Sequence, residues 1–165
     1  MKPNHLAIIM DGNRRWAVSN NYPSYEGHRI GAKNLWNVLK DVQKHNIKYL
    51  TLFVFSTENW KRSKKEVLFL LTLLDQFLDD LELKVKKYNF KIRFIGDFSP
   101  FSKKIQKKIL FINELTSKKS DVIITLALNY GGRYDIIYGI NKILEKKDSL
   151  QTIKEEDFKG FTLNS

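Results

Sequence analysis

The residues best suited to chemistry lie at the start of the chain, in the segment His5-Leu-Ala-Ile-Ile-Met-Asp-Gly-Asn-Arg-Arg-Trp16. Its apolar run is typical of a buried strand, and Gly12 and Asn13 permit a tight turn after it. If a helix begins there, its first backbone N–H groups, with Arg14 and Arg15, suit a phosphate or pyrophosphate. Asp11 would then suit a hard cation such as magnesium bound to that anion. The alternative is a plain strand–turn–helix corner in which Asp11 and Asn13 only cap the helix.

Strands alternate with helices along the whole sequence. Apolar runs predict four buried strands, at residues 5–10, 48–55, 90–96 and 121–128. Helical patterns follow them at about 29–45, 64–87, 100–117 and 132–147, with Ser99 and Pro100 predicted as the N-cap and first residue of the third helix. This alternation predicts an α/β fold with a mainly parallel sheet that is flanked by helices on both faces.

Ligands of such sheets bind beyond the carboxyl ends of the strands, so the loops that follow the strands are the place to look for a site. Three of these loops combine hydrogen-bonding side chains with arginine: residues 11–16, residues 56–62 (Ser-Thr-Glu-Asn-Trp-Lys-Arg) and residues 129–133 (Asn-Tyr-Gly-Gly-Arg). Together they predict a site for an anionic ligand at one edge of the sheet. Asp97, after the third strand, is expected to be a turn residue.

Two further features have more than one interpretation. His28 and Arg29, near the start of a helix, are able to donate to the same phosphate, but a histidine there is ordinarily a surface or capping residue. Residues 64–87 carry a wide apolar stripe, which ordinary core packing explains. The same stripe would also suit contact with a second subunit or a long hydrocarbon ligand.

Composition limits the function classes. The chain has 165 residues, 42% of them hydrophobic, which suits one well-packed domain. Its formal charge of +11 is compatible with nucleic acid, an anionic lipid surface or a phosphorylated substrate, although lysines spread along helices also form ordinary solvated faces. Without cysteine and with three histidines, the sequence has no spacing for a structural zinc site or a thiol nucleophile. No apolar run suggests a membrane span or a signal peptide, so we expect a cytoplasmic protein.

Several motifs, in this order and spacing, resemble the cis-prenyltransferase family, whose bacterial members include undecaprenyl diphosphate synthases, also called isoprenyl transferases. The matching segments are residues 5–17, Gly27-His-Arg-Ile-Gly31, Thr51-Leu-Phe-Val-Phe-Ser-Thr-Glu-Asn-Trp-Lys-Arg62 with Glu66-Val67, Ile95-Gly-Asp97, and Asn129-Tyr-Gly-Gly-Arg-Tyr-Asp-Ile136. The likeness extends over about residues 5–147, and the Met-Asp-Gly-Asn and Phe-Ser-Thr-Glu-Asn-Trp blocks are its most specific parts.

The resemblance implies a magnesium-dependent transferase that condenses isopentenyl diphosphate onto an allylic diphosphate such as farnesyl diphosphate. The expected product is a cis-polyprenyl diphosphate, undecaprenyl diphosphate in bacteria, and one wall of the tunnel for the growing chain would be the apolar face of residues 64–87. The resemblance also implies that Asp11 is the catalytic aspartate and holds the magnesium ion. It assigns proton removal to Asn59, which we interpret as an orienting or relay group because an amide is too weak a base to act alone. The implied substrate-binding residues are Gly12, Asn13, Arg14, Arg15, Trp16, His28, Ser56, Thr57, Glu58, Trp60 and Arg62.

The sequence departs from the family at two places. Ser24 stands where the family usually has an arginine, so one phosphate contact is expected to be missing unless Arg29 or another basic residue replaces it. The family's C-terminal Arg-x-Ser and glutamate, which complete the magnesium and isopentenyl diphosphate site, have no counterpart after residue 147, although Thr152-Ile-Lys-Glu155 is typical of a capping box. We therefore expect residues 1–165 to form a single cis-prenyltransferase-like domain that is incomplete at its C-terminal end.

These departures keep alternative functions open. The first alternative is a noncatalytic subunit that binds a lipid diphosphate or stabilises a partner. The second, a nucleic-acid-binding domain, rests only on the positive charge, and we expect no nucleic-acid partner. A homodimer or a partner subunit is possible under the resemblance, and membrane contact is expected to be peripheral at most.

Overall fold

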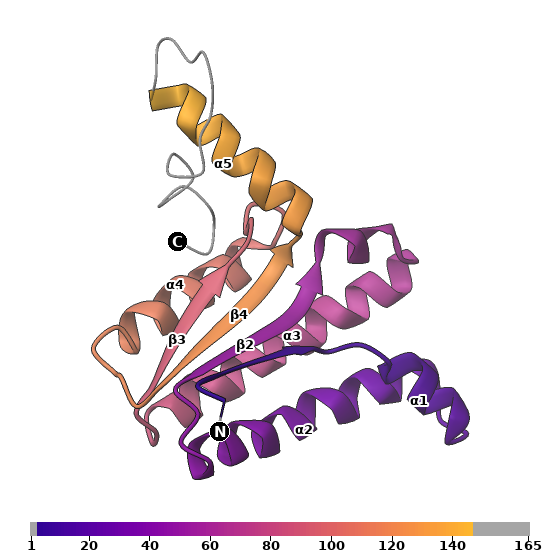
Figure 1. Cartoon of the computed structure of the whole chain (residues 1–165). Coiled ribbons are helices and arrows are strands. Elements are labelled where there is room, and N and C mark those ends of the chain that lie inside the picture. Colours follow the sequence, from indigo (N-terminus) through magenta and orange to yellow (C-terminus); the bar gives the residue numbers. More distant parts are fainter. Residues whose placement is uncertain (1–2, 147–165) are drawn as a thin grey trace.

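Four parallel strands, in the order β1-β2-β4-β3, form the frame of the molecule (Figure 1). The structure is a computed structural model that describes residues 3–146. The elements are β1 (His5–Ile9), α1 (Asn13–Ser19), α2 (Ser24–Lys44), β2 (Tyr49–Ser56), the 3-10 helix η1 (Thr57–Lys61), α3 (Lys64–Val85), β3 (Phe90–Ile95), α4 (Lys103–Leu115), β4 (Val122–Tyr130) and α5 (Gly132–Lys146). The expected strand–helix alternation and parallel pairing are confirmed.

One face of the sheet carries the hydrophobic core. Side chains that alternate toward this face, such as Leu50, Leu52 and Ile124, are fully buried and form one cluster with apolar residues of α2, α3 and α4. On the opposite face Ile9 is 75% exposed and Tyr49 is 38% exposed. Within residues 3–146, α2, α3 and α4 all pack on one face, so the prediction that helices cover both faces is wrong for these three helices.

Two helices begin at other residues than the sequence predicts. The helix expected from about residue 29 begins at Ser24, directly after Pro23, whose ring fixes φ at −56°. The Ser99–Pro100 start expected for α4 is wrong, because the Ser102 hydroxyl caps this helix. Ser99 and Pro100 lie in a turn, and the next residue, Phe101, is only 3% exposed. We attribute the later start of the helix to the burial of the Phe101 ring.

Helix α1 and helix α2 touch at Gly27. A Cβ atom built on Gly27 would lie 2.0 Å from the carbonyl oxygen of Asn13, at the first residue of α1. A residue without a side chain is therefore needed at position 27 to let α2 approach the turn that follows β1. No helix among residues 3–146 combines the length and apolar content needed to cross a membrane, and the predicted Thr152–Glu155 capping box lies outside the described residues.

Replacing Gly27 by alanine should lower the free energy of unfolding by about 1–3 kcal/mol, because α1 or α2 must shift to accommodate the added methyl group. Gly132→Ala is the control, since its Cβ would meet nothing within 4 Å. Urea denaturation measures both variants. Equal stabilities for the two variants would show that the close approach at Gly27 does not constrain the fold.

Candidate active site

The turn after β1 presents a carboxylate beside free backbone donors. Gly12 has a φ of 82°, in the left-handed region that glycine adopts without strain, and its N–H group donates to Asp11 Oδ1 at 2.6 Å. Helix α1 begins at the next residue, so its first N–H groups have no carbonyl partner within the helix. The Asp11 side chain is 77% exposed, and its Oδ2 lies 3.9 Å from Arg15 Nη2, a loose contact. The predicted tight turn is confirmed.

A hollow of about 310 Å³ opens beside this turn, and we call it the Asp11 hollow. It brings together β1, the start of α1, and residues of α2 and α3 that are distant in sequence. It is lined by Met10, Asp11, Gly12, Asn13, Arg14, Arg15, His28, Arg62 and Glu66. Six of the predicted site residues, Asp11 to Arg15 and Arg62, therefore meet His28 in one place.

His28 is held in a partly buried, uncharged state. Its side chain is 13% exposed and its Nε2 atom is buried without a hydrogen-bond partner, 3.7 Å from Glu66 Oε1. Burial, followed by the nearby Arg62 guanidinium, lowers the pKa of His28 below its ordinary value of 6.5. A buried ring nitrogen without a hydrogen-bond partner, on a residue that lines this hollow, is suited to hydrogen bonding with a ligand.

Arg62 joins several parts of the site. Its Nη1 donates to Glu66 Oε1 at 2.7 Å, in a contact that crosses from the end of η1 to the first turn of α3. Glu66 was part of a matching motif but not among the predicted site residues. This ion pair holds Arg62 beside His28. The orientation of the Arg62 side chain could not be predicted from the sequence.

The 3-10 helix η1 is fixed by a capping box that uses Asn59. The backbone N–H of Ser56 donates to Asn59 Oδ1 at 3.0 Å, and the Ser56 side chain accepts from the backbone of Asn59 in return. The Asn59 carbonyl oxygen is thus occupied by a backbone donor. One acceptor position of Asn59 Oδ1 is thereby used, and the amide NH₂ of Asn59 can donate to a ligand.

A second hollow, of about 610 Å³, lies between the ends of β1, β2 and β4, and we call it the Arg133 hollow. It contains the predicted residues Ser56, Thr57, Glu58 and Asn59, and it shares Asp11 and Arg62 with the Asp11 hollow. Residues 130–134 form its other wall. Residues 129–133 were predicted to lie at this edge, but none of them is among the predicted site residues.

Tyr130 supplies a neutral hydroxyl group, whose oxygen can accept a hydrogen bond, to the Arg133 hollow. Its hydroxyl group donates to Asp135 Oδ2 at 2.8 Å, and burial, together with this carboxylate, raises the pKa of Tyr130 to about 12. The phenol therefore stays protonated at neutral pH.

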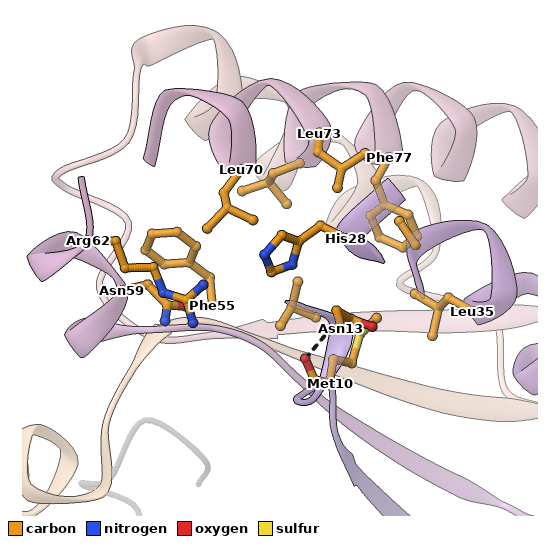
Figure 2. Close-up of a pocket in the computed structure, with 13 residues that line it drawn as sticks. Met10, Asn13, His28, Leu35, Phe55, Asn59, Arg62, Leu70, Leu73 and Phe77 are labelled. Carbon is orange, nitrogen blue, oxygen red and sulfur yellow. Dashed lines mark hydrogen bonds between the residues drawn. The ribbon is translucent and has the colours of Figure 1, made fainter. Parts of the chain in front are cut away.

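An apolar pocket continues inward from the polar residues (Figure 2). Figure 2 shows Asn59 and Arg62 at one end, Leu35 and Phe77 at the other, and His28 between them. The wall on the α3 side consists of Leu70, Leu73, Leu74 and Phe77. The wide apolar stripe of α3 therefore packs into the core and also borders a cavity.

Two predicted site residues lie apart from these cavities. Trp16 is 44% exposed and stacks on Tyr22, with ring centroids 6.0 Å apart, and it lines neither hollow nor the apolar pocket. Trp60 donates from Nε1 to Asn129 Oδ1 at 2.8 Å. Asn129 is 4% exposed, has a φ of 49°, and donates from Nδ2 to the carbonyl oxygen of Asp97 at 2.8 Å. Asn129 thus connects η1 to the turn after β3.

Asp97 and Arg29 can also be compared with their predicted roles. Asp97 accepts from the N–H of Ser99 at 2.9 Å, as expected of a turn residue. Arg29 Nη2 is paired with Glu26 Oε2 at 2.6 Å, and Arg29 lines neither hollow nor the apolar pocket. Among residues 3–146 no group of three or more His, Cys, Asp or Glu side chains could hold a metal ion.

Comparison with known proteins matches this chain to one family. The family described as "Putative undecaprenyl diphosphate synthase" matches residues 9–164. An isoprenyl transferase from Clostridium perfringens is 40% identical over 163 residues, covering 96% of this chain and 64% of the relative. A (2E,6E)-farnesyl-diphosphate-specific ditrans,polycis-undecaprenyl-diphosphate synthase from Vibrio vulnificus is 40% identical over 159 residues, covering 94% of this chain and 63% of the relative.

Solved structures show the same fold. Lavandulyl diphosphate synthase from Lavandula x intermedia, in complex with dimethylallyl diphosphate, has a TM-score of 0.89 and 33% identity, over 98% of this chain and 71% of the other. A probable undecaprenyl diphosphate synthase from Campylobacter jejuni has a TM-score of 0.79 and 34% identity, over 98% and 70% of the two chains. The predicted resemblance is confirmed, and the chain spans 63–64% of the length of the two curated relatives.

The lowered pKa of His28 predicts that its ring titrates below pH 6.5 in the folded protein. Unfolding returns the ring to its ordinary pKa, so the unfolded state binds more protons in acid and the free energy of unfolding falls as the pH drops below about 6.5. NMR titration, with the His28 signal assigned from its loss in His28→Asn, measures the midpoint. A midpoint at or above 6.5 in the free protein would contradict the prediction.

Replacing Asn129 by alanine should lower the free energy of unfolding by about 2–4 kcal/mol, because Trp60 Nε1 and the Asp97 carbonyl oxygen lose their partner while alanine retains the left-handed strain. Asn129→Gly loses the same bonds without the strain and should be about 1 kcal/mol more stable than the alanine variant. Urea denaturation gives both values, and the indole N–H resonance of Trp60 reports the lost bond. An unchanged Trp60 resonance in both variants would show that the bond does not hold the indole.

Proposed function

Because this chain belongs to the undecaprenyl diphosphate synthase family of cis-prenyltransferases, we propose that its site condenses isopentenyl diphosphate onto an allylic diphosphate such as farnesyl diphosphate. The product would be a cis-polyprenyl diphosphate, undecaprenyl diphosphate by analogy with the relatives. The observation that supports this most strongly is the continuity of an apolar pocket with two polar hollows. Such a site suits one ligand with a hydrocarbon tail and a charged head, placed beside a second polar ligand.

The allylic substrate would occupy the apolar pocket and the Asp11 hollow together. Asn13, His28 and Arg62 line both cavities, so a ligand that fills the pocket brings its head group to these three side chains. The α3 wall would contact the hydrocarbon chain. The isopentenyl diphosphate would occupy the Arg133 hollow, whose lining residues Arg62 and Arg133 can neutralise its phosphates.

In the proposed reaction the bond between C1 of the allylic group and its diphosphate oxygen breaks, and C1 bonds to C4 of isopentenyl diphosphate. A proton then leaves C2 of the former isopentenyl unit, which creates the new double bond. The departing diphosphate gains negative charge. The N–H groups at the start of α1, with Arg14, Arg15 and Arg62, would stabilise that charge in the Asp11 hollow.

Asn59 would orient the proton transfer rather than accept the proton. It lines both the apolar pocket and the Arg133 hollow, where the two substrates would meet. Its Oδ1 already accepts from Ser56, which leaves the amide NH₂ to hold a phosphate oxygen or a water in place. That oxygen would be the final acceptor of the proton.

The residues at the turn fit a magnesium ion that is bound mainly through the substrate. Proteins commonly hold Mg²⁺ by one or two carboxylates together with phosphate oxygens. Asp11 is an exposed carboxylate that lines the Asp11 hollow and makes only a loose contact with Arg15. When bound there, magnesium would lower the energy of the developing charge on the diphosphate.

Replacing Asp11 by alanine should reduce the incorporation of labelled isopentenyl diphosphate into polyprenyl product by at least about 100-fold, because the charge on the leaving diphosphate loses stabilisation. The assay contains the protein, farnesyl diphosphate and magnesium. Asp80→Ala, which changes an exposed carboxylate on the same protein, is the control and should keep the activity.

Two results would contradict the proposal. Wild-type protein that binds farnesyl diphosphate but forms no product would show that these residues do not suffice for elongation. Activity that is equal in Asp11→Ala and Asp80→Ala would remove Asp11 from the reaction.

A further inference from the structure

A third hollow, of about 320 Å³, lies beside His28, between the starts of α2 and α3. We call it the Lys65 hollow. Ser24 and Ser63 contribute hydroxyl groups to its lining, and Arg14 and Lys65 contribute positive charges. Tyr25 and Phe69, whose rings are 5.6 Å apart, form an aromatic part of its wall.

The charge in the Lys65 hollow favours an anion. Within residues 3–146 neither Arg14 nor Lys65 is engaged in an ion pair. Glu66 also lines the hollow, but its carboxylate is paired with Arg62 at 2.7 Å. Two cations outside ion pairs and two hydroxyl groups therefore line one hollow, a combination that suits a phosphate group.

The apolar pocket, the Asp11 hollow and the Lys65 hollow adjoin one another at His28, which suits a single molecule. His28 lines all three, while Arg14 and Glu66 line both the Asp11 hollow and the Lys65 hollow. Figure 2 shows His28 between the apolar end of the pocket and Arg62. A ligand with its tail in the apolar pocket and its first phosphate in the Asp11 hollow would carry a second phosphate toward Arg14 and Lys65.

We propose that Lys65, with Arg14 and the Ser24 hydroxyl, binds the distal phosphate of the allylic diphosphate, which makes Lys65 a residue that distinguishes a diphosphate from a monophosphate. This inference rests on the proposed function. It assigns the phosphate next to the hydrocarbon chain to the Asp11 hollow and the outer phosphate to the Lys65 hollow.

Calorimetric titration with farnesyl diphosphate and farnesyl monophosphate, in the presence of magnesium, tests the assignment. Lys65→Gln should weaken diphosphate binding about tenfold, the effect of losing a charge-assisted contact, and should leave monophosphate binding unchanged. The matched control is Lys64→Gln, which removes the same charge from the preceding residue of α3. Lys64 does not line the Lys65 hollow, so its variant should bind both ligands like the wild type.

Two outcomes would overturn the inference while leaving the proposed function intact. Equal diphosphate affinities for Lys65→Gln and Lys64→Gln would show that Lys65 makes no contact with the ligand. An equal loss of affinity for both ligands in Lys65→Gln would show a general effect of charge rather than recognition of the outer phosphate. If wild-type protein binds neither ligand, the proposed function fails first and the inference fails with it.

Discussion

The parallel alignment of the strands is the constraint on which the site depends. Because β1, β2 and β4 run in the same direction and are direct neighbours, the loops that follow them open at one edge of the sheet. Residues separated by more than 100 positions, such as Asp11 and Arg133, thereby line the same hollow. An antiparallel neighbour would have sent one of these loops to the opposite edge.

The candidate site combines an apolar pocket with an exposed polar hollow. The apolar pocket lies between the sheet and α3, whereas the Asp11 hollow lies at the exposed start of α1. Arg62 and His28 stand at the boundary, and each is held by its surroundings: Arg62 by Glu66, and His28 by burial. Burial and the Arg62 guanidinium lower the pKa of His28, which disfavours a further positive charge in the hollow.

Much of the site could be predicted from the sequence because local rules determine it. The Asp11-Gly12 turn follows from an apolar run that ends at a glycine, and the edge position of three loops follows from strand–helix alternation. Side-chain partners could not be predicted in this way. The hydrogen bond of Trp60 to Asn129 joins residues 69 positions apart, and it depends on the left-handed backbone at Asn129. The start of α4 was missed because burial of Phe101, a tertiary effect, outweighed the local signal of Ser99 and Pro100.

The position of Arg62 means that the cavities are not electrically independent. This guanidinium lines the apolar pocket, the Asp11 hollow and the Arg133 hollow, and it carries one positive charge for all of them. A phosphate that draws Arg62 toward one hollow changes the charge available to the other, and weakens the hold of Arg62 on Glu66. If ligands bind in two of these cavities, thermodynamic linkage would make the effect reciprocal, and the occupancy of each would change the affinity of its neighbour.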